Sequence, residues 1–289
     1  MTRVADLALT ALAPAIWGTT YIVTTELLPE GYPLTVAGLR ALPAGLLLLA
    51  LTRVLPPKAW LGRVFLLGLM NFALFWGLLF VAAYRLPGGA AATIGALQPL
   101  IVLIFGHVLL GSGIRPLSVV AALSGAAGVS LMLLGPEAHY DPVGLLAAFA
   151  ATVSMSAGTV LSRKWQPDVP VLVFTAWQLT AGGVILSLAA LLTEPPLPAL
   201  TLPNIAGLIW LGLIGAALTY VLWLRGIARL EPQSVSLLGM LSPVVAVALG
   251  WVVLDEALGP LQLVGAGVVL GSIWAGQQIL ARQAAKPNP

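Results

Sequence analysis

Residues 88–108 read GGAAATIGALQPLIVLIFGHV, and residues 232–252 read PQSVSLLGMLSPVVAVALGWV. Each stretch is almost wholly apolar and about 20 residues long, the length of helix that crosses a bilayer. Each also carries a glycine four residues before a proline, and the proline leaves the glycine carbonyl without its helical N–H partner. The two pairs are Gly95 with Pro99 and Gly239 with Pro243. Two matched breaks predict a binding site between the halves of a membrane carrier, although a packing kink is the alternative for each break alone.

The composition indicates an integral membrane protein. Hydrophobic residues make up 60% of the 289 residues and charged residues only 8%, whereas a soluble domain carries about 25% charged residues. The sequence contains no cysteine, which excludes disulfides and cysteine metal sites, and we expect no metal. The net charge of +3 comes from basic residues spread over short loops, so we expect no nucleic-acid partner.

Ten apolar runs are long enough to span a membrane. They lie at about residues 5–25, 34–52, 63–84, 88–108, 116–134, 142–162, 171–192, 204–224, 232–253 and 259–280. With the N-terminus inside, eleven of the 13 Lys and Arg residues fall in cytoplasmic segments, Arg85 alone falls outside, and Arg40 lies within the second run. This asymmetry predicts a multi-pass protein of the cell inner membrane with both termini in the cytoplasm.

The chain also repeats itself. A shift of 137 or 144 residues superposes three pairs of prolines: Pro33 on Pro170, Pro99 on Pro243 and Pro116 on Pro260. We therefore expect two units, residues 1–138 and 139–289, with five runs each. An odd number of crossings makes the second unit enter the membrane from the opposite side. The predicted fold is an all-α integral membrane protein, with ten transmembrane helices forming two inverted five-helix repeats around a central cavity.

Trp17, Thr20 and Tyr21 share one face of the first run at helical spacing. Aromatic and hydroxyl side chains on one face could line the cavity and bind substrate. The alternative is that they bond to neighbouring helices or form an aromatic belt at the membrane surface.

The third and eighth runs carry a matched set of large side chains. The shift of 144 lays Trp76 on Tyr220 and Leu79 on Trp223. We therefore expect aromatic side chains on both sides of one cavity, with substrate-binding candidates Asn71, Phe75, Trp76, Leu79, Tyr220 and Trp223. Asn71 could equally join helices, because a buried amide needs a partner. Tyr84 lies close to the outer mouth and could gate it.

The fourth, sixth and ninth runs supply the remaining candidates. Gln98 stands beside the first break and is the best single candidate for a hydrogen bond to substrate, while the carbonyls of Gly95 and Gly239 could accept from an ammonium group. The full set is Gly95, Gln98, Pro99, Ser156, Gly239, Met240 and Pro243. Hydroxyls such as that of Ser156 also often bond to their own helix backbone.

Charged and small residues within the runs have structural interpretations. Arg40 is the one charge well inside a run, and we favour pairing with backbone carbonyls or a lipid headgroup over a direct functional role. His107 is a weaker candidate for titration. The pairs Ser124 with Gly128 and Gly267 with Gly271 could hold the two halves together or form a homodimer.

Short motifs in a fixed order give the sequence a family resemblance. They are Trp17-Gly18, Pro33 followed by Arg40, Gln98-Pro99-Leu100, and Ser242-Pro243 leading to Asp255-Glu256. The chain resembles the EamA family of the drug/metabolite transporter superfamily, in particular its amino-acid and metabolite exporters of the aromatic amino-acid exporter type. The resemblance implies a central substrate cavity and export from the cytoplasm. One departure is Gly111-Ser112-Gly113, where the family usually has an acidic residue, which argues against an essential paired role for Glu256.

The residues favour a secondary transporter. No acidic residue lies in mid-membrane for a proton relay, and no phosphate-binding glycine loop is present, so we expect no cofactor and no direct use of ATP. The predicted function is export of amino acids or similar small metabolites across the lipid bilayer by alternating access, facilitated or by exchange. A channel-like pore, or an exporter of other drugs or metabolites with proton coupling, is the alternative. An enzyme is not expected, because neither of the two histidines lies near an intramembrane acid.

Overall fold

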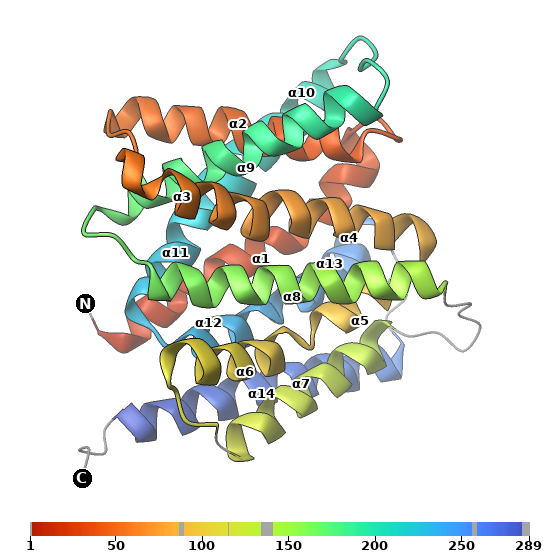
Figure 1. The fold of residues 1–289 in the computed structure, drawn as a ribbon. Helices are drawn as coiled ribbons and strands as arrows, with labels where there is room; N and C mark the ends of the chain where they lie inside the picture. The colour runs from red at the N-terminus through yellow and green to blue at the C-terminus, as the bar shows by residue number, and fades with distance from the viewer. Residues whose placement is uncertain (1, 87–89, 115, 134–140, 256–258, 285–289) are drawn as a thin grey trace.

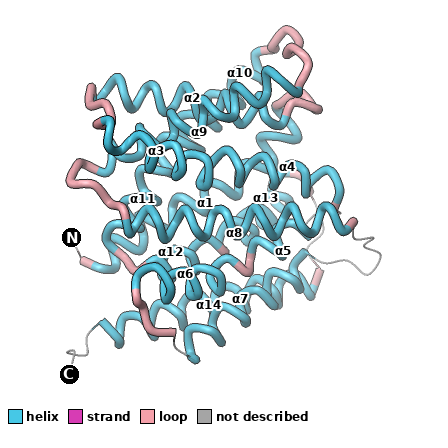
Figure 2. The backbone as a smooth tube through the Cα atoms, in the orientation of Figure 1, coloured by secondary structure: helices cyan, strands magenta, loops and turns pink. Residues whose placement is uncertain are grey.

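The computed structural model describes residues 2–86, 90–114, 116–133, 141–255 and 259–284. Within these ranges the chain forms helices joined by loops and no β-strand (Figure 2). In chain order the helices are α1 (Arg3–Leu27), α2 (Pro33–Thr52), the short 3-10 turn η1 (Lys58–Trp60), α3 (Leu61–Gly68), the π-helix η2 (Leu69–Ala73), α4 (Leu74–Arg85), α5 (Ala90–Gly95), α6 (Gln98–Leu110), α7 (Pro116–Leu133), α8 (Pro142–Lys164), α9 (Val171–Thr193), α10 (Leu202–Ile209), the π-helix η3 (Trp210–Leu218), α11 (Thr219–Arg229), α12 (Pro232–Gly239), α13 (Leu241–Val253) and α14 (Pro260–Ala284).

The helices form a membrane domain. Nine helical segments in the described part of the chain are long and apolar enough to cross a bilayer, and α1 is a further helix of 25 residues. Large apolar side chains point outward, as Leu192 does with 85% of its surface exposed. In Figure 1 the long helices run side by side, and α1 begins at the same end of the molecule at which α14 ends. These features confirm an all-helical, multi-pass membrane protein.

Two membrane segments are interrupted beside the prolines. Helix α5 ends at Gly95 and α6 begins at Gln98, whereas α12 ends at Gly239 and α13 begins at Leu241. Proline lacks the N–H that would continue the helical ladder, which accounts for both interruptions. The sequence therefore located these breaks correctly.

Two other membrane segments contain π-helical turns that the sequence did not predict. One is η2, between α3 and α4, and the other is η3, between α10 and α11. A π-helix replaces i→i−4 hydrogen bonds with i→i−5 bonds, and such turns often occur at functional sites. The two π-helices lie in segments that the shift of 144 residues superposes.

The contacts between helices in one half of the chain have counterparts in the other half. Helix α2 packs along α9, and α7 packs along α14. Helix α1 contacts α11 and α13, and α8 contacts α4 and α6. When the membrane segments are counted in chain order, each of these contacts has a counterpart between the segments five places further along or back. The contact of α1 with α11, for example, corresponds to the contact of α8 with α4.

Glycines allow the two most extensively packed pairs of helices, α2 with α9 and α7 with α14, to lie close together. A Cβ atom added to Gly183 on α9 would lie 2.5 Å from the backbone N of Leu42 on α2. A Cβ atom added to Gly128 on α7 would lie 2.8 Å from the carbonyl of Gly265 on α14. Cβ atoms added to Gly267 and Gly271 would meet nothing within 4 Å. Gly128 therefore joins helices within the chain, whereas Gly267 and Gly271 do not.

Candidate functional site

An aromatic cluster lies where α1, η2, α4 and α11 meet. The ring of Trp17 lies 5.1 Å from that of Tyr220 and 5.0 Å from that of Trp223. Tyr220 in turn lies 4.5 Å from Phe72 and 6.2 Å from Trp76. The cluster brings together Trp17, Trp76, Tyr220 and Trp223, which the sequence predicted to lie around one site. Phe72, which the sequence pattern did not single out, also belongs to the cluster.

The two broken segments approach this cluster. A Cβ atom added to Gly239, the last residue of α12, would lie 3.6 Å from the Trp223 ring and 3.8 Å from Oε1 of Gln98. Gln98 is the first residue of α6, directly after the other break. A Cβ atom added to Gly95 would meet nothing within 4 Å, so space remains beside the α5 end. The structure thus brings Gln98, Trp223 and Gly239 together.

Two hydrogen-bond donors at this junction lack partners. Nε2 of Gln98 and Nε1 of Trp223 are buried, and neither has an acceptor among the described residues. Trp223 itself is only 2% exposed. A buried donor without an acceptor costs about 1–3 kcal/mol. A bound molecule that presents acceptors here would remove this penalty.

Other candidates border the junction in different ways. Nε1 of Trp17 donates to Oγ1 of Thr219 at 2.9 Å, which fixes the indole against α11. Oγ1 of Thr20 is buried without a partner among the described residues. Phe75 packs against the apolar clusters around both Tyr220 and Trp223. Leu79 is half-buried on the same helix as Phe75.

Asn71 and Ser156 are occupied by contacts within the fold. Nδ2 of Asn71 donates to Oγ of Ser162 at 3.1 Å and to Oε1 of Gln178 at 2.8 Å. This network joins η2 to α8 and α9. Asn71 therefore joins helices, which was the alternative to its binding substrate. Oγ of Ser156 donates to the carbonyl of Thr152 at 2.7 Å, as hydroxyls in helices often do.

The remaining candidates on the broken segments pack against neighbouring helices. Met240 is buried in the cluster shared with α7 and α14. Pro99 is buried, and Pro243 is half-buried. The backbone next to Pro243 lies close to α1, because a Cβ atom added to Gly18 would lie 2.8 Å from the Ser242 carbonyl. The side chains of Tyr21 and Tyr84, and the whole of Glu256, lie outside the described residues.

Arg40 is buried next to the aromatic cluster and is only 8% exposed. Its Nη2 donates to the carbonyl of Gly215 in η3 at 2.7 Å, and its Cζ lies 4.7 Å from the centre of the Trp76 ring. The carbonyl contact confirms the predicted pairing with backbone, and it links α2 to the second π-helix.

Ion pairs lie near the helix ends. Asp6 on α1 pairs with Arg225 on α11 at 2.5 Å and with Arg229 at 3.5 Å. Near the opposite end of the helices, Arg85 donates to Asp141 at 3.0 Å. That hydrogen bond and the N–H of Val143 hold the pKa of Asp141 below its usual value, so the carboxylate stays charged at neutral pH.

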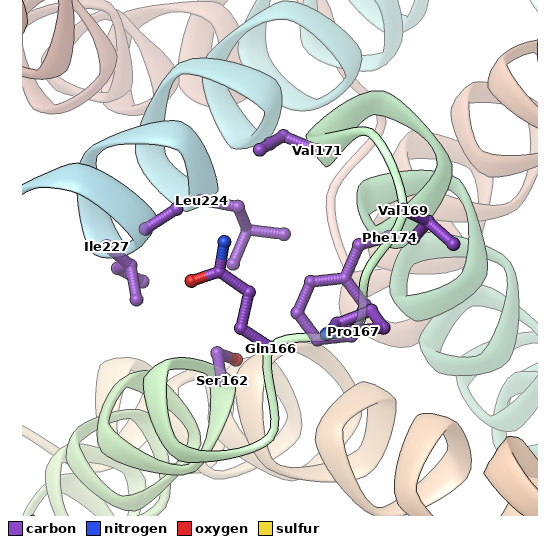
Figure 3. A pocket seen from close by; sticks show the side chains of 9 residues that line it. Ser162, Gln166, Pro167, Val169, Val171, Phe174, Leu224 and Ile227 are labelled. Atoms are coloured by element: carbon purple, nitrogen blue, oxygen red, sulfur yellow. The ribbon is translucent and has the colours of Figure 1, made fainter.

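A separate pocket opens at the end of the molecule where α8 leads into α9 (Figure 3). Its cavity volume is about 10 Å³, roughly the room that one water molecule needs. Side chains from α8, from the loop before α9, from α9 and from α11 line it, including Ser162, Gln166, Phe174, Leu224 and Ile227. This pocket was not foreseen from the sequence, because its walls come from segments about 60 residues apart.

Comparison with known proteins identifies relatives over most of the chain. The sequence profile of the EamA-like transporter family matches residues 6–134 and 142–275. Protein PecM of Dickeya dadantii (strain 3937) is 44% identical over 269 residues, covering 92% of this chain and 90% of that protein. The uncharacterized inner membrane transporter YedA of Escherichia coli (strain K12) is 30% identical over 266 residues, covering 89% of this chain and 86% of YedA.

Two further matches of lower identity extend over nearly the whole chain. A probable amino-acid metabolite efflux pump of Escherichia coli (strain K12) is 24% identical over 292 residues and covers 93% of each chain. A crystal structure with 22% sequence identity covers 98% of this chain and 100% of its own, with a TM-score of 0.83. At this identity the likeness establishes the fold alone.

Proposed function

The chain belongs to the EamA-like transporter family, and we propose that it exports amino acids or similar small metabolites from the cytoplasm by alternating access. The family and the relatives make it a membrane transporter and not an enzyme. A relative described as a probable amino-acid metabolite efflux pump supports the choice of substrate class and direction.

One observation carries the proposed site: two buried donors that have no acceptor among the described residues lie beside an aromatic surface at the two helix breaks. Gln98 and Trp223 supply the donors, and the rings of Trp17 and Tyr220 supply the apolar wall. Within the described membrane segments no carboxylate lies at this junction. Such a site suits a small molecule that has hydrogen-bond acceptors and an apolar body. The carbonyls freed by Pro99 and Pro243 could accept from its ammonium group.

The proposed architecture is ten transmembrane helices in two inverted units, residues 1–138 and 139–289. Three features support this architecture: helix contacts that correspond between the two units, helix breaks at matching positions, and π-helices at matching positions. The family profile also matches one segment in each unit. In such a duplicated fold, exchanging the conformations of the two units converts a site open to one side into a site open to the other.

The proposed orientation places both termini in the cytoplasm. Helices α2 and α8 end at the end of the molecule that holds the start of α1 and the end of α14 (Figure 1). Arg53 directly follows α2, and Arg163 lies in the last turn of α8. Basic loops stay on the cytoplasmic side of a membrane. The proposed substrate pathway then runs from this end toward the loop that precedes α10.

The proposed mode of transport is facilitated diffusion or exchange. The described membrane segments place no acidic side chain near Gln98 or Trp223, so no carboxylate is available there to carry a proton. A channel-like pore and proton-coupled export of other drugs or metabolites are the alternatives. Counterflow of labelled substrate would favour the carrier, single-channel currents would favour the pore, and a pH gradient that drives accumulation would favour proton coupling.

The direct test is efflux of labelled neutral amino acids from liposomes that contain the purified protein. Export should exceed that from protein-free liposomes. Replacing Gln98 by Ala should raise KM about five-fold, which is the effect of losing one hydrogen bond of about 1 kcal/mol. Gln278→Ala, on an exposed face of α14, is the matched control and should leave KM unchanged. Efflux equal to that of protein-free liposomes across the amino-acid panel would contradict the proposed substrate class.

A further inference from the structure

Ion pairs lie at both ends of the helices, and they occupy corresponding places in the repeat. At one end, Asp6 in the first turn of α1 pairs with Arg225 and Arg229 near the end of α11. At the other end, Asp141, which caps the start of α8, pairs with Arg85, the last residue of α4. The shift of 144 residues lays Arg85 on Arg229, and α8 is the counterpart of α1. At both ends, an acid at the start of one helix therefore meets arginine at the end of another.

Both sets of ion pairs cross the boundary between the two proposed units. We infer that they are two latches, one closing each end of the carrier, an inference that rests on the proposed transport by alternating access. The inner latch joins Asp6 to Arg225 and Arg229 at the proposed cytoplasmic end, and the outer latch joins Asp141 to Arg85 at the opposite end. Both latches are formed in this structure, so each one must break when the site opens to its side.

The latched helices also build the proposed site. Trp17 lies on α1 and Trp223 lies on α11, with their ring centres 5.0 Å apart. Helix α4 carries Trp76, and α8 carries Met155, which belongs to the same apolar cluster as Trp223. Parting α1 from α11 at the inner end, or α4 from α8 at the outer end, would therefore open the site toward that end.

A glycine brings the helices together beside each latch. A Cβ atom added to Gly226 on α11 would lie 2.5 Å from Oγ1 of Thr10 on α1. A Cβ atom added to Gly144 on α8 would lie 3.0 Å from Cβ of Arg85 and 2.8 Å from Cγ of Leu86, at the end of α4. These distances are shorter than the optimal separation of about 3.5–4.0 Å between non-bonded carbon atoms. The helices therefore touch without a gap beside both latches.

The two latches differ in how far water reaches them. At the inner latch, the side chains of Arg225 and Asp6 are 16% and 12% exposed. At the outer latch, the side chains of Arg85 and Asp141 are 50% and 32% exposed. Removing one partner of a buried ion pair is strongly unfavourable, whereas an exposed pair contributes little. The inner latch should therefore be the harder of the two to open.

The end of α11 is also held from a second side. Nη1 of Arg163, near the end of α8, donates to the carbonyls of Ile227 and Ala228 in the last turn of α11. At the cytoplasmic end, α11 is thus tied to α1 through Asp6 and to α8 through Arg163. These contacts add to the difference between the two ends.

The first test makes the same substitution at both ends. Asp6→Asn and Asp141→Asn each remove one charge, and Asp141→Asn keeps an oxygen that can accept from the N–H of Val143 and cap α8. Each is combined with Gly239→Cys, which places the only thiol of a cysteine-free chain at the proposed site. The measurement is the rate at which this thiol reacts with an impermeant maleimide. Inside-out vesicles probe the cytoplasmic face, and right-side-out vesicles probe the outer face.

Each substitution should raise the reaction rate from its own face alone. Asp6→Asn should raise the rate from the cytoplasmic face about ten-fold or more, because it breaks a largely buried ion pair. Asp141→Asn should raise the rate from the outer face only about two- to five-fold, because the pair there is exposed. Gln278→Ala, on an exposed face of α14, is the matched control and should change neither rate.

The second test wedges each latch open with every charge in place. Gly226→Ala should raise the rate from the cytoplasmic face, and Gly144→Ala should raise the rate from the outer face, because each adds a Cβ atom where the helices touch. A general loosening of the fold would instead raise the rate from both faces. A rise from both faces with both variants of one end, or no rise from the matching face with either of them, would overturn the latches.

The labelling needs no substrate, so the latches and the proposed function can fail separately. Transport of amino acids without labelling that differs between the faces would overturn the latches and leave the proposed function standing. Labelling that changes at the matching face, without transport of any amino acid in the panel, would support the latches and contradict the proposed substrate class.

Discussion

At the scale of single residues, hydrogen-bond partners separate structural from functional side chains. Asn71 and Gln98 are both amides within apolar segments, and the sequence made both of them candidates. The amide nitrogen of Asn71 has partners 91 and 107 residues away, whereas that of Gln98 has none among the described residues. The sequence identified both amides as unusual. It could not show which one is structural and which one is free to bind substrate, because the partners come from distant helices.

This difference predicts opposite effects on stability and transport. Asn71→Ala should lower the free energy of unfolding in detergent by about 1–3 kcal/mol, since it leaves the buried amide oxygen of Gln178 with only the long 3.4 Å bond from Ser162. Gln98→Ala should leave the unfolding temperature unchanged and weaken substrate binding instead. Thermal unfolding followed by circular dichroism measures the first effect. Equal destabilisation by the two substitutions would contradict the distinction.

A second residue-scale prediction concerns Glu194, directly after α9. Its carboxylate accepts from the N–H groups of Leu34 and Thr35 at 2.6 and 2.8 Å, and from Oγ1 of Thr35 at 2.6 Å. It therefore caps the start of α2, where Tyr32 supplies no side-chain cap. Glu194→Ala should lower the free energy of unfolding by about 1–2 kcal/mol, as the loss of a helix cap does. An unfolding temperature equal to that of the wild type would show that the cap contributes nothing.

At the scale of helices, the sequence predicted what depends on local chemistry. The breaks at Gly95 and Gly239 were predicted because proline removes an N–H wherever the helix lies. The π-helices η2 and η3 were not predicted, since all of their residues except Asn71 are ordinary apolar ones. One of them is tied to its neighbour by a long-range contact, the bond from Arg40 to Gly215. Features that depend on packing against distant helices leave no such local signal.

The pairing of α2 with α9 gives a prediction at the helix scale. Gly183→Ala places a Cβ atom 2.5 Å from the backbone of Leu42, so α2 and α9 must separate. The variant should therefore unfold at a lower temperature in detergent than the wild type. Gly271→Ala is the matched control, because its Cβ meets nothing within 4 Å and alanine favours helices over glycine by about 1 kcal/mol. Its unfolding temperature should stay the same or rise, and an equal loss in both variants would contradict the close packing.

At the scale of the whole molecule, the pattern of helix contacts repeats in the two halves of the chain, as the sequence does. Helix α1 contacts α11 and α13, and its counterpart α8 contacts α4 and α6. These contacts surround the junction of the two broken segments. The length of the repeat and its matched prolines were evident in the sequence. The aromatic side chains that fill the centre could be assigned to one site by the repeat, but their distances required the three-dimensional fold.

The central claim is that one site between two matched breaks opens alternately to each side of the membrane. Gly95→Cys and Gly239→Cys test it directly, because a Cβ atom at Gly95 meets open space and one at Gly239 makes only ordinary contacts of 3.6 and 3.8 Å. The measurement is the rate at which each single thiol reacts with an impermeant maleimide added from either face of sealed vesicles. The account predicts reaction from both faces at both positions, slowed by a transported amino acid on either side. Reaction with membrane-permeant reagents alone, or rates that no substrate changes, would contradict it.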